Sequence, residues 1–171
     1  HKETSPMSVL PTIIQGGMGV GISSWALANA VSRYGQLGVV SGTALDAVLI
    51  RNLADGDPGG HYRRAMESFP LPDVVAEALD KYFNRSGRQE GEPYPAMKMH
   101  KRVLDLWQEK VIALANFAEV TLAKENHDGP VGINLLTKIQ LPNLGSLYGA
   151  MMAGVDYVLM GAGIPRSIPG I

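Results

Sequence analysis

Short apolar runs alternate with amphipathic stretches along most of the chain. Four runs are rich in branched aliphatic residues and end in small residues, which is typical of buried strands: residues 8–15, 37–40, 131–136 and 155–160. Between them, apolar residues recur at steps of three and four, which predicts helices after Ser24, after Thr43, from Leu104 to Leu122 and after Pro142. Buried strands that alternate with helices predict an α/β fold with a parallel sheet.

Two regions stand outside this alternation. Residues 55–103 contain short helical pieces and a polar stretch, and we interpret them as an insertion on one side of the core. Residues 1–6 have no apolar signal core, and Met7 rather than His1 can be a translation start. We therefore expect residues 1–6 to be a cloning remnant and residues 7–171 to form the folded part.

Composition narrows the class of function. Lys and Arg number 15 against 16 Asp and Glu, for a formal charge of −1, which indicates neither a nucleic-acid nor an acidic-membrane partner. No apolar run has the roughly 18 residues of a membrane span. The chain has 0 Cys, which excludes disulfides and thiolate metal sites, and the spacing of its Asp residues fails the calcium-loop pattern. We expect a cytoplasmic protein with no metal site that acts on a small molecule.

Each predicted strand ends in or near small residues. They are Gly16-Gly17-Met18, Ser41-Gly42-Thr43, Asn134 and Gly161-Ala162-Gly163. Ligands of parallel α/β folds lie beyond the carboxyl ends of the strands, and glycine lets backbone N–H groups approach a planar or anionic ligand. These strand ends therefore predict a shallow floor for a flat ring system.

A dinucleotide site of the Rossmann type is the competing interpretation. The run from Gly19 to Ser24 is a near miss to the G-x-G-x-x-G pattern, but the second strand ends in Ser41-Gly42-Thr43 rather than in an acidic residue. The Rossmann interpretation remains an alternative.

Four segments together resemble one enzyme family. Pro11-Thr12-Ile13-Ile14-Gln15-Gly16-Gly17-Met18-Gly19 resembles the opening strand of the nitronate monooxygenases, the 2-nitropropane-dioxygenase-like FMN enzymes. The second, third and fourth strands of that family are similar to residues 37–43, 132–135 and 154–165. The resemblance covers most of the chain outside residues 55–103.

This resemblance implies a fold, a cofactor and a set of contacts. The family fold is a parallel (β/α)₈ TIM-type barrel, of which this chain would supply about the first four βα units. The backbone of Gly16, Gly17 and Met18 would touch the ring of FMN, and Asn134 would hydrogen-bond to it. Gly161 and Gly163 would leave room beside the ring.

The implied reaction is oxidation of nitronates by oxygen through FMN. Flavin enoyl reductases of fatty-acid and polyketide synthesis, which depend on NAD(P)H, share the same opening half, so they are one alternative. An alternative of a different class is a non-catalytic half-barrel, either a fragment or a subunit.

A complete (β/α)₈ barrel needs about 200 to 250 residues. The phosphate-binding loops and the His that the family uses as a base would then lie in the remainder of the barrel, in the same polypeptide or in a second chain. His1, His61, His100 and His127 all miss the matching position. We expect the catalytic residues to lie outside this chain, which would be inactive alone; a homo-oligomer is a further option.

Each candidate residue also has a simpler interpretation. Met18 can be a core residue, Asn134 can cap the following loop, and Gly161 and Gly163 can be turn glycines. His61 is either part of a lid or a solvated helix start. Lys138 either meets an anion or lies on the surface.

Overall fold

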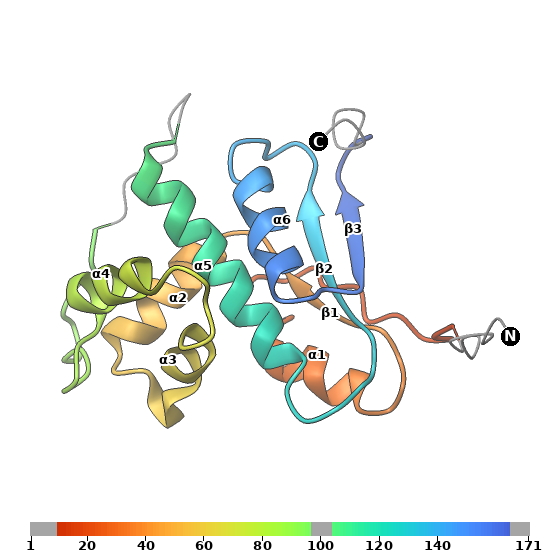
Figure 1. Cartoon of the computed structure of the whole chain (residues 1–171), viewed down its shortest axis with the longest axis horizontal. Coiled ribbons are helices and arrows are strands. Elements are labelled where there is room, and N and C mark those ends of the chain that lie inside the picture. The colour runs from red at the N-terminus through yellow and green to blue at the C-terminus, as the bar shows by residue number, and fades with distance from the viewer. Residues whose placement is uncertain (1–9, 97–103, 165–171) are drawn as a thin grey trace, which may run out of the picture.

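The computed structural model describes residues 10–96 and 104–164. The expectation for residues 1–6 lies outside these ranges, as do the first two residues of the predicted strand 8–15. The helices and strands follow in the order α1 (Trp25–Ser32), β1 (Gly38–Ser41), α2 (Leu45–Ala54), the short 3₁₀ turn η1 (Pro58–Gly60), α3 (His61–Met66), α4 (Pro72–Tyr82), α5 (Leu106–Ala123), β2 (Val131–Leu136), α6 (Asn143–Met152) and β3 (Tyr157–Gly161) (Figure 1).

Three strands form one parallel sheet in the order β1-β2-β3. The register aligns Asn134 of β2 with Ser41 of β1 on one side and with Leu159 of β3 on the other. The predicted strands at 37–40, 131–136 and 155–160 and the parallel sheet are therefore confirmed. The carboxyl ends of all three strands lie at the same edge, as parallel pairing requires.

The predicted TIM-type barrel is wrong for this structure, because the described residues form a small open sheet and residues 10–15, the described part of the predicted strand at 8–15, form no strand. Ile14 makes only one isolated parallel bridge, to Leu37. The next donor along β1, Val39 N–H, bonds to the side-chain Oε1 of Gln15 at 2.9 Å instead of to a backbone carbonyl. The chain then turns at Gly17, where φ is +64°. The Gln15 side chain thus takes the place of the next backbone hydrogen bond between the predicted strand and β1.

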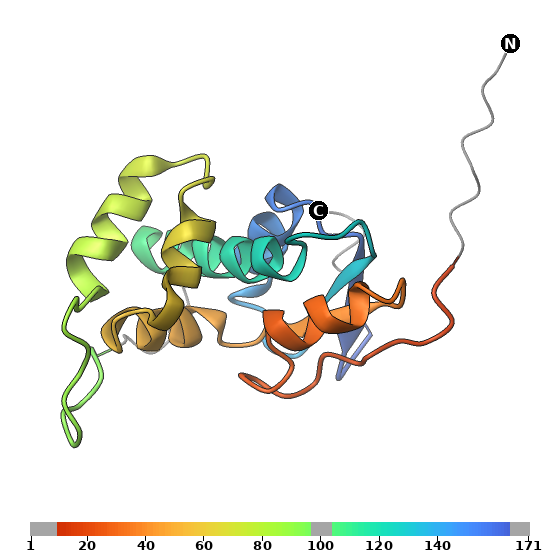
Figure 2. The same ribbon diagram turned by 90° about the horizontal axis from the view of Figure 1, so that it is seen from below.

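One face of the sheet is covered by α1, α5 and α6. The core between them consists of side chains from every layer: Ala28, Val40, Val120, Ala123, Val131, Ile133, Leu135, Leu147 and Ala150. On the opposite face the segment that precedes α1 runs along the sheet (Figure 2). The sheet therefore has one helix-covered face and one face that only an irregular segment touches.

A second core lies within the helices. It joins α2, α3 and α4 to the other side of α5 and includes Leu49, Leu53, Met66, Phe69, Leu114, Phe117 and Leu122. The polar stretch after α4 is fastened to this layer by Asp55, which pairs with Arg88 at 3.2 Å and accepts a hydrogen bond from Tyr94 at 2.9 Å. Residues 55–96 thus form a helical layer that shares its core with α2 and α5.

Helix α5 is shared by both cores. Its N-terminus carries a capping box, in which Asp105 accepts from the N–H of Gln108 at 2.8 Å and Gln108 accepts from the N–H of Asp105 at 3.2 Å. From Val111 to Ala123 almost every side chain is buried, so the helix is apolar around its whole circumference. The predicted helix at 104–122 is confirmed and is the central element of the fold.

Glu119 is the charged exception on this buried helix. It is 1% exposed; its Oε1 accepts from the N–H of Trp25 at 2.7 Å and its Oε2 from the hydroxyl of Tyr62 at 2.8 Å. Burial raises the pKa of Glu119, and the two hydrogen bonds act against that rise. Burial and the adjacent carboxylate also raise the pKa of Tyr62. One side chain of α5 thereby fixes the start of α1 and the start of α3.

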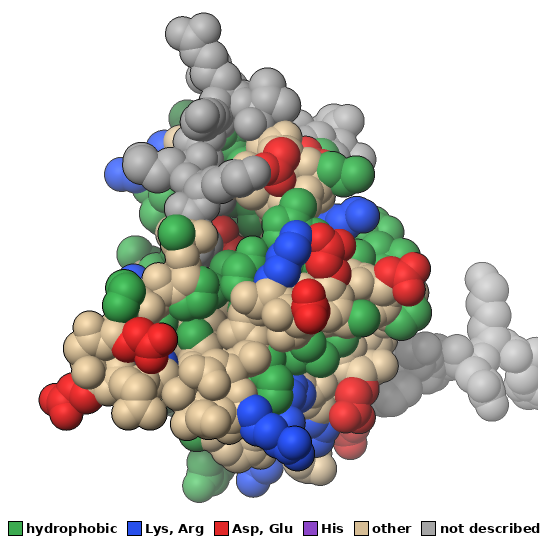
Figure 3. All heavy atoms as spheres, turned by 90° about the vertical axis from the view of Figure 1, so that its left-hand side faces the viewer, with side chains coloured by type: hydrophobic (Ala, Val, Ile, Leu, Met, Phe, Trp, Pro, Cys, Tyr) green, Lys and Arg blue, Asp and Glu red, His purple; other side chains and the backbone are tan. Residues whose placement is uncertain are grey.

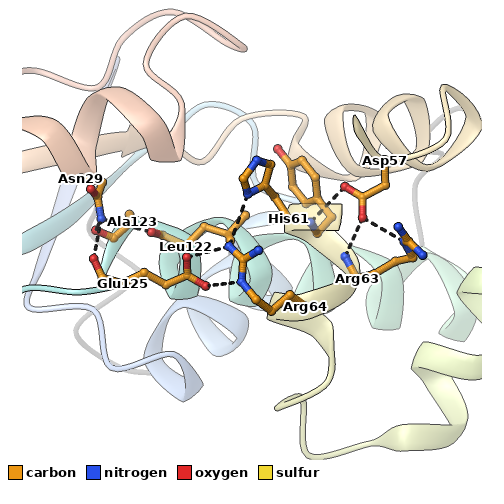
Figure 4. Close-up of polar contacts among 9 residues, drawn as sticks. Asn29, Asp57, His61, Arg63, Arg64, Leu122, Ala123 and Glu125 are labelled. Carbon is orange, nitrogen blue, oxygen red and sulfur yellow. Dashed lines mark hydrogen bonds and ion pairs between the residues drawn. The ribbon is translucent and has the colours of Figure 1, made fainter. Parts of the chain in front are cut away.

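Further polar contacts hold α1 and α3 at the carboxyl end of α5 (Figure 4). Asn29 donates to the carbonyls of Ala123 and Glu125 at 3.2 and 2.8 Å. Arg64 pairs with the Glu125 carboxylate at 2.8 Å. Asp57 accepts from the N–H groups of Tyr62 and Arg63 at 3.1 and 3.0 Å, which caps α3 from outside the helix.

We expect Tyr62→Phe to destabilise the fold. The substitution leaves Oε2 of Glu119 buried without a donor, which costs about 1–3 kcal/mol in the free energy of unfolding. Urea denaturation measures this change. Tyr34→Phe is the matched control, because Tyr34 is 84% exposed and a surface change of this kind stays within about 0.5 kcal/mol. Equal stability of Tyr62→Phe and the unmodified chain would contradict the role given to Glu119.

The raised pKa of Glu119 makes stability depend on pH. The unfolded chain loses this proton at the ordinary Glu pKa of about 4.3, whereas the folded chain holds it to higher pH. The contribution is therefore fully present below the ordinary pKa and is lost as pH rises through the folded pKa. Glu119→Gln does not titrate. We expect the stability of the unmodified chain relative to Glu119→Gln to fall as pH rises from about 4; denaturation of both proteins across pH measures it, and a constant difference would refute it.

Candidate functional site

The predicted site residues meet at the carboxyl end of β2. Nδ2 of Asn134 donates to the carbonyl of Gly16 at 2.9 Å and lies 3.2 Å from Sδ of Met18. Gly161, at the end of β3, lies beside the same side chain. We call Gly16, Met18, Asn134 and Gly161 the strand-end cluster. The structure thus brings together four of the six residues that the sequence predicted.

Asn134 carries an acceptor with no protein partner. The residue as a whole is 8% exposed. Its side-chain oxygen Oδ1 is buried and makes no hydrogen bond within the described residues. Such buried orphan acceptors are rare in folded proteins, because each forfeits the hydrogen bond it had with water. Since Nδ2 is held by Gly16, the amide is fixed in orientation and Oδ1 is left for a donor from elsewhere.

Gly161 leaves space next to this acceptor. A Cβ built on Gly161 would lie 3.6 Å from Oδ1 of Asn134, which is ordinary van der Waals contact. Any larger group at position 161 would therefore occupy the approach to the amide oxygen. Gly161 is the last residue of β3, so the simpler interpretation of it as a turn glycine is wrong.

Gly163 lies beside a different residue. A Cβ at Gly163, where φ is +151°, would come within 3.2 Å of Cβ of Thr137. The hydroxyl of Thr137 is also buried without a hydrogen-bond partner in the described part of the chain. Sequence reasoning missed Thr137, although its place directly after the strand that ends at Leu136 is a signal of the kind that selected Asn134.

Gly17 has a packing role that its neighbours do not share. It is buried, and a Cβ built on it would lie 2.5 Å from Cγ1 of Val39 and 3.0 Å from the Val39 carbonyl oxygen. Its φ of +64° also favours glycine. Gly17 therefore lets the segment before α1 sit directly on the open face of the sheet, which carries Gly16 to Asn134.

The structure speaks against the simpler interpretations of Met18 and of Asn134. Met18 is 73% exposed, so it is not a core residue. The amide of Asn134 reaches across to Gly16 and does not cap the loop after β2. That loop is held instead by Asn143, whose Nδ2 donates to the carbonyl of Leu136 at 3.2 Å.

Two further candidates, His61 and Lys138, make no contact with the strand-end cluster among the interactions of the described residues. The ring of His61 packs against Trp25, with centroids 5.0 Å apart, and its Nδ1 lies 3.3 Å from Nη2 of Arg64. His61 is thus part of the joint between α1 and α3. Lys138 is exposed just beyond β2.

The electrostatics of the strand-end cluster come from dipoles. Its members are two glycines, a methionine and an asparagine, so the cluster itself contains no titratable group. Over the described ranges, no set of three or more His, Cys, Asp or Glu residues is placed to hold a metal ion. The cluster can therefore orient a neutral hydrogen-bonding ring, whereas proton transfer would need a group from elsewhere.

The face of the molecule formed by the helical layer shows no concentration of charge of one sign (Figure 3). Acidic, basic and apolar side chains are interspersed on the side of the molecule formed by the helical layer (Figure 3). In the part of the chain that the structure describes, no helix combines the length and the apolar character needed to cross a membrane.

Comparison with known proteins yielded no match: no family model, curated protein or solved structure corresponds to this chain.

A pair of glycine substitutions tests the geometry of the cluster. Gly17→Ala places a methyl group against Val39 at a positive φ, so we expect a loss of more than about 1 kcal/mol in the free energy of unfolding. Gly161→Ala adds only a normal contact and should leave stability close to that of the unmodified chain. Thermal and urea denaturation measure both, and equal effects at the two positions would contradict the structure.

Proposed function

We propose that this chain belongs to a flavin-dependent oxidoreductase of the nitronate monooxygenase type and holds FMN at the strand-end cluster. The observation that carries the proposal is the fixed, buried and unpaired oxygen of Asn134. The resemblance of four segments to that enzyme family selects a flavin from among the flat heterocycles that can supply a donor to this oxygen.

The residues present fit such a ring. Oδ1 of Asn134 would accept a hydrogen bond from a ring N–H, and Gly161, which has no side chain, lies beside that atom. The exposed side chain of Met18 offers a polarisable apolar surface against which a flat ring packs well. Asn134 would therefore contact the edge of the ring, and Met18 would pack against its face.

FMN, when bound, would supply the two-electron redox chemistry between the substrate and oxygen. The residues of the cluster bind and orient, because none of them can exchange a proton near neutral pH. The base that the reaction requires is supplied from outside the cluster in this proposal. The substrate is a small nitronate, and the setting is the cytoplasm.

FMN titration of the purified chain tests the cofactor. Binding should quench flavin fluorescence and shift the visible absorption of FMN, because the ring leaves water for a fixed environment. An unchanged flavin spectrum at saturating protein would remove the proposal and leave a non-catalytic role for the chain.

A substitution tests where the ring lies. Gly161→Ala places a methyl group 3.6 Å from Oδ1 of Asn134, where a ring nitrogen would have to come closer. We expect it to weaken FMN binding by about tenfold, which is the worth of one lost hydrogen bond of about 1.4 kcal/mol. Tyr34→Phe is the control for FMN affinity, since Tyr34 is exposed and lies outside the cluster. Unchanged affinity in folded Gly161→Ala would place the ring elsewhere.

Anaerobic reduction of the flavin-loaded protein tests the reaction type. Bleaching by a nitronate but not by NADPH is the result expected from a nitronate monooxygenase. Rapid bleaching by NADPH would identify a flavin enoyl reductase instead. Retained flavin that neither compound bleaches would contradict the proposed reaction, although FMN would still be bound.

A further inference from the structure

The segment that forms α6 and β3 is almost free of charge. Between Lys138 and Arg166, Asp156 is the single charged residue in the sequence. Helix α6 nevertheless lies at the surface, with Leu144, Tyr148 and Met151 exposed by 57%, 60% and 68%. These three residues recur at steps of four and three and so form one row along the helix.

A surface helix normally carries charged residues on its outer side. Helix α4 of this protein does so, with Glu77 and Lys81 paired on its exposed side. The opposite side of α6 is packed against α5, where a Cβ on Gly149 would lie 2.1 Å from the Ala113 carbonyl. The row at 144, 148 and 151 therefore lies outside this close contact, with Leu144 and Tyr148 at the rim of a groove beside α5, and it is an apolar side of α6 that no described residue covers.

Strand β3 continues this apolar surface. It is the last strand in the sheet order, so half of its backbone N–H and C=O groups face away from β2. Val158 pairs with Ile133 and shares its helix-covered face, yet it is 41% exposed because no described helix lies beyond α6. Natural edge strands are usually protected by Lys, Pro or a bulge, and the sequence of β3, Tyr-Val-Leu-Met-Gly, contains neither Lys nor Pro.

We propose that the β3 edge and the outer row of α6 form the interface of a two-fold symmetric dimer of this chain. A two-fold axis through the sheet edge pairs β3 with its copy in antiparallel fashion. The strands would then lie about 4.8 Å apart. Leu147 and Ala150 pack α6 onto β2, and Met160 of β3 packs on the same core, so each helix lies slightly inside the edge strand. The two α6 helices are thereby brought to about 10 Å, near the usual packing distance of helices.

The charge pattern selects a second copy as the occupant. A two-fold axis brings identical residues together, so a self-interface must avoid like charges near the axis. Neither α6 nor β3 carries a charge, and Asp156 at the start of β3 is already paired with Lys124 at 2.7 Å. A partner chosen by electrostatic complementarity would need charges here that the chain lacks.

Further apolar surface lies beside the row on α6. Leu144 and Tyr148 line a groove of about 410 Å³ between α5 and α6, together with Leu106 and other mostly apolar residues; Glu109 and Lys110 of α5 stand at its far side. Contiguous apolar patches beyond a few hundred Å² are uncommon on monomers. Pairing of the strand edges adds backbone area, which brings the interface toward the roughly 800 Å² per partner of stable complexes.

Cross-linking tests the proposal directly, because the chain has no cysteine. Tyr148→Cys places one thiol in the middle of the exposed row of α6, and a short bis-maleimide should join two copies. Tyr34→Cys is the matched control, since Tyr34 is exposed by 84% but lies after α1. Cross-linking of Tyr148→Cys alone is expected, whereas equal cross-linking at both positions, or none at 148, would overturn the interface.

Sedimentation equilibrium of the whole chain supplies the second measurement. We expect a dimer whose dissociation constant rises at least about tenfold in Met151→Lys and in Val158→Lys, because each puts like charges across the axis. Tyr34→Lys should dimerise like the unmodified chain. Both test positions are exposed in the monomer, so folding, checked by circular dichroism, should persist. A monomer at all concentrations, or a dimer that neither substitution weakens, would refute the proposal.

Discussion

The carboxylate of Glu119 is the contact on which the relative placement of the layers depends. It sits on the helix shared by both cores, and its two oxygens hold the first N–H of α1 and the hydroxyl of Tyr62 in α3. A carboxylate at 1% exposure is costly unless each oxygen has a donor. That cost makes the contact selective, since any shift of α1 or α3 along α5 would leave a buried oxygen unpaired.

The strand-end cluster inherits its geometry from this joint. Because Trp25 is fixed, the residues just before it are fixed as well, and Ser23 accepts from the N–H of Ser41 at 2.9 Å. Gln15 is tied to the same point through Ser23 at 3.3 Å and to β1 through Val39 at 2.9 Å. These contacts connect the helical core to residues 15–23, and they position the carbonyl of Gly16 beside the amide of Asn134. The orientation of the Asn134 amide is thus a property of the whole fold.

The sequence predicted what depends on local pattern. The runs at 131–136 and 155–160 form strands, and Asn134 and Gly161 were selected because they stand at strand ends. The run at 8–15 has the same pattern but fails, because a side chain of Gln15 takes the hydrogen bond that a strand would have made. The barrel was predicted from the resemblance and from counting that run as a strand. Neither argument can detect that a side chain competes with the backbone for the Val39 N–H.

Contacts between distant positions were beyond sequence reasoning for a physical reason. Glu119 and Trp25 are 94 residues apart, and a glutamate within an apolar helix gives no sign of which N–H it will accept. Ser24 stands at the N-cap position of α1, yet its side chain makes no cap hydrogen bond, and Glu119 takes that role. Caps made by side chains from another helix are set by tertiary packing, so the local cap rule identifies where a helix begins but not what satisfies its N–H groups.

The two edges of the sheet differ in how far other segments cover them, and this difference affects the strand-end cluster. At the β1 margin, Gln15 and the bridge at Ile14 occupy part of the exposed backbone. At the β3 margin no described segment does so, and Gly161 of the cluster belongs to β3 itself. Whatever covers β3 would therefore pack against the strand whose last residue, Gly161, lies beside the buried Asn134 oxygen. A hydrogen bond to that oxygen would gain strength as water is excluded, because its electrostatic part grows in a less polar surrounding. In the two proposals, assembly at the sheet edge and binding at the strand ends would thus be coupled through one strand.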